Sequence, residues 1–211
     1  MTAIDSASRL LAQTAGLLVD LDGTLVDSSG PVERAWTDFA ARHGLDPAKV
    51  LRRAHGRPSR ETVRVFAPPA DHAEEERRLE AAECADTEGT RPLPGAQRLL
   101  SSPGHPIALV TSCSARLAAV RLRAAGLEAP AIAVTADDVS RGKPDPECFL
   151  LGARALGLDP ADCLALEDSP AGVAAARTAG ARVIALRTTH SDPELGEADV
   201  IVDDLGVLWA G

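Results

Sequence analysis

The sequence has few of the features that mark nucleic-acid-binding or membrane proteins. Its formal net charge is −9 at pH 7, and no run of Lys and Arg offsets this acidic balance, so we expect no nucleic-acid partner. The N-terminus has neither a cationic flank nor a long apolar core, so neither an export signal nor a membrane span is expected. The chain also has no tyrosine, two tryptophans and three phenylalanines, which leaves few rings for stacking on a nucleobase.

Cysteine is scarce as well. The four cysteines, Cys84, Cys113, Cys148 and Cys163, are widely spaced and form no Cys-x-x-Cys pair. We therefore predict free thiols in a reducing compartment and a cytoplasmic protein. At 211 residues, the chain can bury a sizeable core without a disulfide or a structural metal. Its length fits one domain with a large insertion, or two small domains.

Short apolar runs alternate with helical patterns along most of the chain. This alternation is typical of a parallel sheet with helices on its faces, so we predict an α/β fold. Three of the intervening helices have clear start and stop residues, at 114–126, 145–157 and 169–180. The strand-like runs are Gly16–Leu21, Ile107–Thr111, Ala131–Thr135, Cys163–Leu166, Val183–Leu186 and Val200–Val202.

The region from 31 to 89 interrupts the alternation. Its pattern is helical throughout, with Trp36, Phe39 and Phe66 as its few large anchors. The charged residues 74–78 are expected to form a solvated helix face. Residues 90–95 would return the chain to the sheet. We therefore predict a helical insertion over residues 31–89, and a core formed by residues 1–30 and 90–211.

The most informative segment follows the first predicted strand. The apolar run ends in Asp20-Leu21-Asp22-Gly23, and side chains at i and i+2 of a strand share a face, so Asp20 and Asp22 can converge on one ligand. Two neighbouring carboxylates repel unless a cation or a shared proton relieves them. Gly23 lets the backbone turn tightly beside whatever the carboxylates hold. A calcium-binding loop is disfavoured, because its third acidic position and terminal glutamate are missing.

Other polar residues follow strands of the same predicted sheet, whose carboxyl ends form the usual ligand-binding edge. Thr111 and Ser112 end the second strand, and Glu167 and Asp168 follow the fourth. Lys143 is one of two lysines in a chain that otherwise uses arginine, which suggests that a compact ammonium is needed there. Each feature alone also fits a helix cap, a turn or a surface charge. Together, in this order, they predict a site that handles phosphate.

With these residues in view, the chain resembles the haloacid-dehalogenase-like hydrolase superfamily, in particular members with a small helical cap inserted after the first motif. Asp-Leu-Asp-Gly-Thr, Val-Thr-Ser, Gly-Lys-Pro-Asp-Pro and Glu-Asp-Ser-Pro-Ala-Gly-Val match its four motifs, and the resemblance runs from Gly16 to Val202. It implies a Rossmann-like parallel sheet with the cap as the helical insertion. The first 15 residues show no match and are expected to form an arm or an extra turn.

Within the superfamily, the chain is most similar to the sugar and polyol phosphatases, including the glycerol phosphatase and 2-deoxyglucose-6-phosphatase types. His55-Gly56-Arg57 in the cap and Thr87-Glu88-Gly89 before the linker resemble local patterns of that subgroup. The resemblance implies a phosphatase acting on small sugar or polyol phosphates rather than nucleotides, and a monomer. The cap residues expected to contact the leaving group are His55, Arg57, Arg60 and Glu88.

The resemblance also implies roles for the core residues. Asp20 would attack phosphorus and become an aspartyl phosphate, which splits one hard step into two. Asp22 would act as general acid and then general base. Mg²⁺ would be held by Asp20, the Asp22 carbonyl and Asp168, with Glu167 orienting a metal-bound water. The residues expected to hold the phosphate oxygens are Gly23, Thr111, Ser112 and Lys143.

Two other functions stay open. A sugar phosphomutase of the β-phosphoglucomutase type would use the same core residues. Mutases carry a hinge histidine ten residues after the acid/base aspartate, and this chain has Val32 at that position. Arg60, however, could hold the second phosphate that a mutase binds. A module that binds a phosphorylated ligand without catalysis is the other alternative, although every motif position carries a competent residue. A dehalogenase or phosphonatase is disfavoured, because those enzymes lack the second aspartate that Asp22 supplies.

Overall fold

The core of the protein is a six-stranded sheet, described by a computed structural model that covers residues 2–54, 56–101 and 104–209. The strand order is β5-β4-β1-β6-β7-β8, and every neighbouring pair in it is parallel. This arrangement confirms the predicted Rossmann-like α/β fold and places the first strand at the centre of the sheet. The strands are β1 (Gly16–Val19), β4 (Ile107–Val110), β5 (Ile132–Val134), β6 (Cys163–Glu167), β7 (Arg182–Leu186) and β8 (Val200–Val202).

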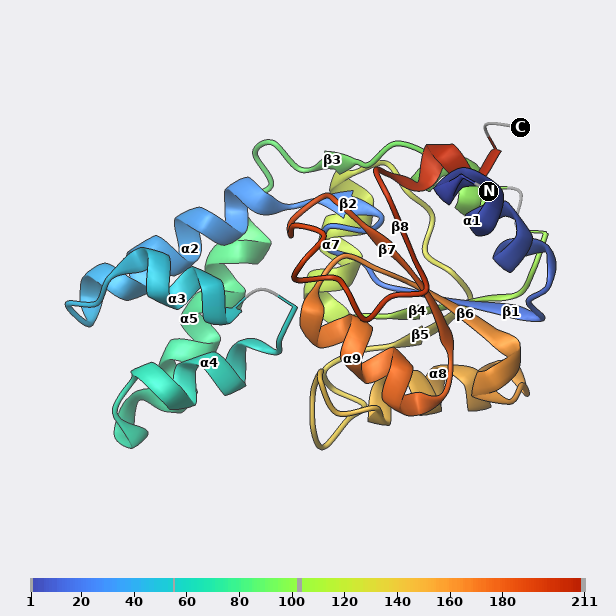
Figure 1. Ribbon diagram of the computed structural model, residues 1–211. Helices are drawn as coiled ribbons and strands as arrows, with labels where there is room; N and C mark the ends of the chain where they lie inside the picture. The colour runs from blue at the N-terminus through green and yellow to red at the C-terminus, as the bar shows by residue number, and fades with distance from the viewer. Residues whose placement is uncertain (1, 55, 102–103, 210–211) are drawn as a thin grey trace.

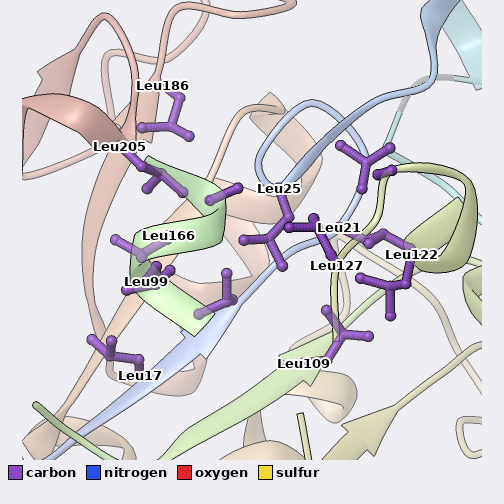
Figure 2. Close-up of a cluster of buried hydrophobic side chains, with 14 of the residues drawn as sticks. Leu17, Leu21, Leu25, Leu99, Leu109, Leu122, Leu127, Leu166, Leu186 and Leu205 are labelled. Atoms are coloured by element: carbon purple, nitrogen blue, oxygen red, sulfur yellow. The ribbon is translucent and has the colours of Figure 1, made fainter. Parts of the chain in front are cut away.

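Helices cover both faces of this sheet (Figure 1). Side chains alternate between the faces along each strand, so Leu17 and Val19 join one apolar cluster while Leu18 joins the other. Figure 2 shows the leucine-rich cluster on the first face. The first layer contains α1 (Ala3–Ala12), α6 (Ala96–Ser101), α7 (Ala115–Ala124) and η3 (Leu205–Trp209). The second contains α8 (Glu147–Leu156) and α9 (Pro170–Ala179), and η2 (Pro160–Asp162) leads into β6.

The N-terminal residues form a helix rather than an arm. Thr2 caps α1, because its side chain accepts a hydrogen bond from the Asp5 backbone while the Asp5 carboxylate accepts one from the Thr2 backbone. Ala7 is buried in the first cluster, and α1 packs against β8 and η3, so the first and last described elements of the chain lie side by side (Figure 1). The expectation of an arm or an extra turn was wrong, because this reciprocal Thr2–Asp5 cap, which starts a ten-residue helix, was not recognised.

A two-stranded antiparallel ribbon joins the sheet to the inserted helices. β2 (Val26–Asp27) pairs with β3 (Arg91–Pro92), and Arg91 donates to the Asp27 carboxylate at 2.6 Å. The chain leaves the core along β2 and returns along β3, within the segment predicted as the return linker. The insertion is therefore connected to the core through two adjacent strands.

The insertion is helical, and in Figure 1 its helices lie beyond one end of the sheet. Its apolar cluster is centred on Trp36 and Phe39, whose rings meet edge to face with centroids 5.3 Å apart, and Phe66 packs against this cluster from its margin. The division at residues 31–89 stays a prediction. The elements are α2 (Ser29–Arg42), α3 (Pro47–Ala54), α4 (Ser59–Phe66), η1 (Pro69–Asp71) and α5 (His72–Ala85).

The prediction of a solvated face over residues 74–78 was wrong for one residue. Glu75 is buried, and it accepts a hydrogen bond of 2.6 Å from Arg42 of α2. The carboxylate faces inward because α5 packs against α2, and the guanidinium supplies the countercharge that a buried carboxylate needs.

The structure also bears on two expectations drawn from absences. All four cysteines are free; Cys113, Cys148 and Cys163 are buried, and Cys84 is half-buried, as predicted. Among the described residues, the helices are too short or too polar to cross a membrane.

Candidate active site

The loop after β1 places Asp20 at the carboxyl edge of the sheet. β1 ends at Val19, so the prediction of a strand to Leu21 was wrong: the chain turns at once, and the backbone N–H groups of Leu25 and Val26 donate to the Leu21 carbonyl. Asp20 is nevertheless tied to the neighbouring strand, because its N–H donates to the carbonyl of Leu166 at 3.0 Å. Its carboxyl group is almost completely buried.

Gly23 allows this loop to close over the site. Its φ of +81° is a conformation that other residues rarely adopt. A Cβ at this position would also overlap the Asp168 carboxylate. The turn therefore brings the loop after β1 against the loop after β6.

Lys143 lies at the centre of a buried charged cluster. Its Nζ donates to Asp20 Oδ1 at 2.5 Å, to Glu167 Oε1 at 2.6 Å and to the Val110 carbonyl at 3.1 Å. Its side chain is only 1% exposed. Burial alone would lower the pKa of Lys143, but the Asp20 and Glu167 carboxylates outweigh it and raise the pKa well above its usual range.

Glu167 is fixed at both carboxylate oxygens. The oxygen that does not meet Lys143 accepts from the backbone N–H groups of Asp168 and Ser169, at 2.9 Å each, and from the Ser169 hydroxyl at 3.0 Å. A Cβ at Gly172 in the first turn of α9 would overlap this carboxylate. Glu167 is thus held more rigidly than a solvent-facing acid.

Asp168 completes an all-oxygen cluster. One carboxylate oxygen each of Asp20, Glu167 and Asp168 lie within 4.8 Å of one another, and the Thr189 hydroxyl, which sequence reasoning missed, donates to Asp168. Burial raises the pKa of Asp20 to about 8, with Lys143 offsetting only part of the effect, and burial also raises the pKa of Asp168. Three converging carboxylates suit a divalent cation, and hard cations such as Mg²⁺ prefer oxygen ligands, so the residues present fit Mg²⁺.

Thr111 and Ser112 take different positions after β4. The Ser112 side chain lines a cavity above the cluster, and its hydroxyl donates to the Gly56 carbonyl of the insertion at 3.1 Å. Thr111 is buried, and its hydroxyl oxygen accepts from the Cys113 N–H at 3.1 Å. The two residues thus fix the loop and its contact with the insertion.

Asp22 points to a different set of partners from Asp20. Oδ1 accepts from the Ser28 hydroxyl at 2.5 Å. Oδ2 accepts from Nη1 of Arg121 at 2.6 Å and from the Cys113 thiol at 2.9 Å. Asp22 lines the same cavity as Asp20, so the structure brings both predicted carboxylates to one site.

The cavity lies between the sheet edge and the inserted helices and has a volume of about 260 Å³. Its core wall includes Asp20, Asp22 and Ser112. On the other side, α5 contributes three carboxylates that sequence reasoning missed, although their spacing places them on one helix face: Glu76, Glu80 and Glu83. Trp36 and Arg57 also line the cavity from the insertion.

The predicted cap contacts are divided. Arg57 lines the cavity. Arg60 also lines it, but its two terminal nitrogens donate to the carbonyls of Ala136 at 2.8 Å and Val139 at 3.0 Å, so its hydrogen bonds fasten the insertion to the core. Glu88 is exposed, shortly before β3 of the two-stranded ribbon, and is not among the cavity-lining residues. His55 lies outside the described residues.

A parallel sheet with a buried acid cluster at its carboxyl edge, covered by inserted helices, defines the class of capped α/β enzymes. A family model for haloacid dehalogenase-like hydrolases matches residues 14–180. The chain belongs to this family, as its motifs predicted.

Individual relatives agree with this assignment. Hexitol phosphatase A of Escherichia coli strain K12 is 48% identical over 196 residues, covering 90% of this chain and 91% of the relative. The crystal structure of a hydrolase from Pseudomonas syringae gives a TM-score of 0.84 at 27% identity, covering 94% of this chain and 97% of that one. β-Phosphoglucomutase from Clostridium difficile, at 22% identity, shares the fold with a TM-score of 0.79 over 92% of each chain.

Proposed function

We propose that the protein is a Mg²⁺-dependent phosphatase that hydrolyses phosphate monoesters of small sugars or polyols through an aspartyl phosphate on Asp20. The observation that carries the proposal is the placement of Asp20: a buried carboxylate that meets Lys143 at 2.5 Å, stands in an all-oxygen cluster and opens onto a capped cavity. The similarity to a hexitol phosphatase supports the substrate class.

Asp20 acts as the nucleophile. Its oxygen bonds to phosphorus while the bond from phosphorus to the ester oxygen breaks, and water then attacks the acyl phosphate to release inorganic phosphate. Lys143 keeps Asp20 oriented and offers positive charge to the phosphoryl oxygens. Asp22 gives a proton to the leaving oxygen in the first step and takes one from water in the second.

Mg²⁺ would be held by Asp20, Asp168 and the Asp22 carbonyl, with Glu167 fixed behind them. When bound, the ion neutralises charge on the phosphoryl group and lets one anion approach another. Asp20 and Asp168, whose pKa values burial raises, are the groups that a divalent cation would return to the ionised form.

The cavity wall favours a neutral, hydroxylated leaving group. Carboxylates of Glu76 and Glu80 can accept hydrogen bonds from sugar or polyol hydroxyls, and they would repel a second phosphate. This repulsion disfavours the phosphomutase alternative, which needs to hold a second phosphate. Arg60, the residue expected to hold that phosphate, already donates to core carbonyls. Among the described residues that line the cavity, Trp36 alone supplies an aromatic ring, so nucleotides are disfavoured too.

A panel of phosphate esters tests the proposal. We expect hexitol, hexose and glycerol phosphates to release inorganic phosphate faster than nucleoside monophosphates, and EDTA to abolish turnover that Mg²⁺ restores. Faster hydrolysis of nucleotides would contradict the substrate class. Conversion of glucose 1-phosphate to glucose 6-phosphate without phosphate release would favour the mutase, and no turnover of any ester would favour the binding module.

A further inference from the structure

One buried guanidinium next to the site has no part in the steps above. Arg121 projects from α7 of the core, and its side chain is only 6% exposed. A buried arginine is costly unless each end of its guanidinium meets a partner. The partners of Arg121 come from both sides of the cavity.

The two terminal nitrogens of Arg121 bind different carboxylates. Nη1 donates to Asp22 Oδ2 at 2.6 Å and to the Cys113 sulfur at 2.7 Å. Nη2 donates to Glu83 of α5, a buried residue of the insertion. The guanidinium therefore bridges the loop that carries Asp22 and the helix that forms the opposite wall of the cavity.

The remaining oxygen of Asp22 is held from the insertion side too. Ser28, at the start of α2, donates to Oδ1 at 2.5 Å. Both oxygens of Asp22 thus have fixed donors. Two of these donors are linked to the inserted helices, because Ser28 precedes α2 and Arg121 also binds Glu83 of α5. Asp22 is the group whose direction matters most for proton transfer, because a general acid works only within hydrogen-bond reach of the leaving oxygen.

We propose that Arg121 is a positioning residue for Asp22, and that Glu83 supplies the second carboxylate that balances the charge of the buried guanidinium. The inference rests on the proposed function, in which Asp22 is the general acid. The planar fork of arginine suits this task, since it holds two carboxylates in one fixed geometry, which a lysine ammonium does not.

A merely structural role for Arg121 would be neutralisation of the buried Glu83. The two roles differ in how they respond to the leaving group. An alkoxide from a polyol phosphate is a strong base that must be protonated as its bond to phosphorus breaks. p-Nitrophenolate is a weak base that departs without a proton, so its release needs Asp22 far less. The ratio of kcat/KM for the two substrates therefore reports the proton transfer in the first step.

The main variant is Glu83→Gln/Arg121→Met, which removes both charges and so avoids leaving one buried ion unpaired. We expect its ratio of kcat/KM for glycerol 1-phosphate to that for p-nitrophenyl phosphate to fall at least about tenfold, in the same direction as in Asp22→Asn. Glu83→Gln alone keeps the contact between Arg121 and Asp22, so its ratio should change less than about threefold. Arg123→Met, on the exposed side of α7, is the surface control.

An unchanged ratio in the double variant would overturn the inference, even if both rates fell together, because that result describes a structural role. A ratio that falls as far in Glu83→Gln as in the double variant would overturn it as well, since the Arg121–Asp22 contact survives in the single one. Asp22→Asn distinguishes failure of the proposed function from failure of this inference. If its ratio stays at the wild-type value, the general-acid role of Asp22 in the proposed function is wrong. If the ratio falls in Asp22→Asn but not in the double variant, only the role of Arg121 is wrong.

Discussion

The two walls of the cavity are built on different principles. On the core wall, Asp20 follows β1 and is backed by Lys143 and Glu167; all three are almost fully buried, and Lys143 bonds the two carboxylates at 2.5 and 2.6 Å. On the opposite wall, Glu76 and Glu80 project from a helix, are only half-buried and lie in the lining of the cavity. Under the proposed function, the core wall would hold the phosphate and the helical wall would contact the leaving group.

The comparison has a physical origin. The carboxyl ends of parallel strands share one edge, so side chains that follow them are brought together by the sheet itself. The inserted helices are joined to the core by one short ribbon, and hydrogen bonds such as Ser112 to Gly56 and Gly142 to Glu61, at 3.1 and 3.0 Å, seat them on it. A change on the core wall should therefore abolish turnover, whereas a change on the helical wall should alter the choice of substrate.

The largest expected effect is on the core wall, in Asp20→Asn. Without the nucleophile, kcat should fall by more than about 10⁴-fold for every phosphate ester. The fold should survive, because the amide oxygen can still accept from Lys143. Steady-state kinetics and a thermal melt check this, together with trapping of covalently bound phosphate in the wild type and its absence in the variant. Retained hydrolysis with all substrates would refute Asp20 as the nucleophile.

Lys143→Met should lower the stability of the folded protein by removing the ammonium that pairs with the buried carboxylates. The change leaves the Asp20 and Glu167 carboxylates buried without their ammonium, which should destabilise the protein by about 3–5 kcal/mol and lower its thermal midpoint by about 10 °C. Thermal melts in EDTA measure this loss. Added Mg²⁺ should raise the midpoint of both proteins but of the variant more, because carboxylates that have lost their ammonium bind the cation more tightly, so the loss should shrink.

Lys49→Met is the matched control, since Lys49 is exposed and is the other lysine of the chain. Its midpoint should stay within about 2 °C of the wild type. An equal loss in both variants, or a loss in Lys143→Met that Mg²⁺ leaves unchanged, would contradict a cation site among these carboxylates.

The core wall could be predicted from the sequence because the relevant rule is local. Asp20, Thr111 and Asp168 each follow an apolar run, and a parallel sheet brings such positions to one edge. Lys143 was predicted from its motif and from the rarity of lysine. The exact end of β1 at Val19 was missed, because apolar Leu21 extends the hydrophobic run although the backbone already turns there.

The helical wall could not be predicted in the same way. The sequence of α5 is rich in charged residues, and nothing in it distinguishes Glu80 and Glu83 from the exposed charges of the same helix. Only the packing of α5 against the core turns these two carboxylates toward the cavity. Arg121 has a partial signal, since it lies four residues after the buried Leu117, where an apolar side chain would be expected. Its partners Asp22 and Glu83 are distant in sequence, so the ion pairs emerge only in the folded chain.

Glu80→Gln should change selectivity rather than chemistry. Glu80 accepts from the Ser114 hydroxyl at 2.5 Å and lines the cavity, and a neutral amide is a weaker acceptor for substrate hydroxyls. We expect KM for the preferred polyol phosphate to rise about tenfold, with little change in kcat/KM for p-nitrophenyl phosphate. Glu74→Gln, on the same helix but outside the lining, is the control. Equal losses on both substrates would remove Glu80 from the leaving-group contacts.

The smallest effect concerns the stability of the inserted helices. A hydrogen bond from Arg42 lowers the pKa of Glu75 from 4.5, so the pair stabilises the folded state above that pH and loses its contribution as the pH falls through the lower, folded value. Glu75→Gln should therefore cost about 1 kcal/mol near pH 7 and progressively less below about pH 4.5, because the wild-type carboxyl becomes neutral too. Urea unfolding across this range measures the difference.

Asp38→Asn provides the sharpest control for that prediction. Asp38 accepts from the same guanidinium at 3.0 Å, but its side chain is 79% exposed whereas that of Glu75 is 5% exposed. Solvent screens an exposed pair, so Asp38→Asn should change the unfolding free energy by less than about 0.5 kcal/mol at any pH. Two equal losses would mean that burial of Glu75 contributes nothing to the pair, and a loss in Glu75→Gln that persisted in acid would assign it to packing instead of charge.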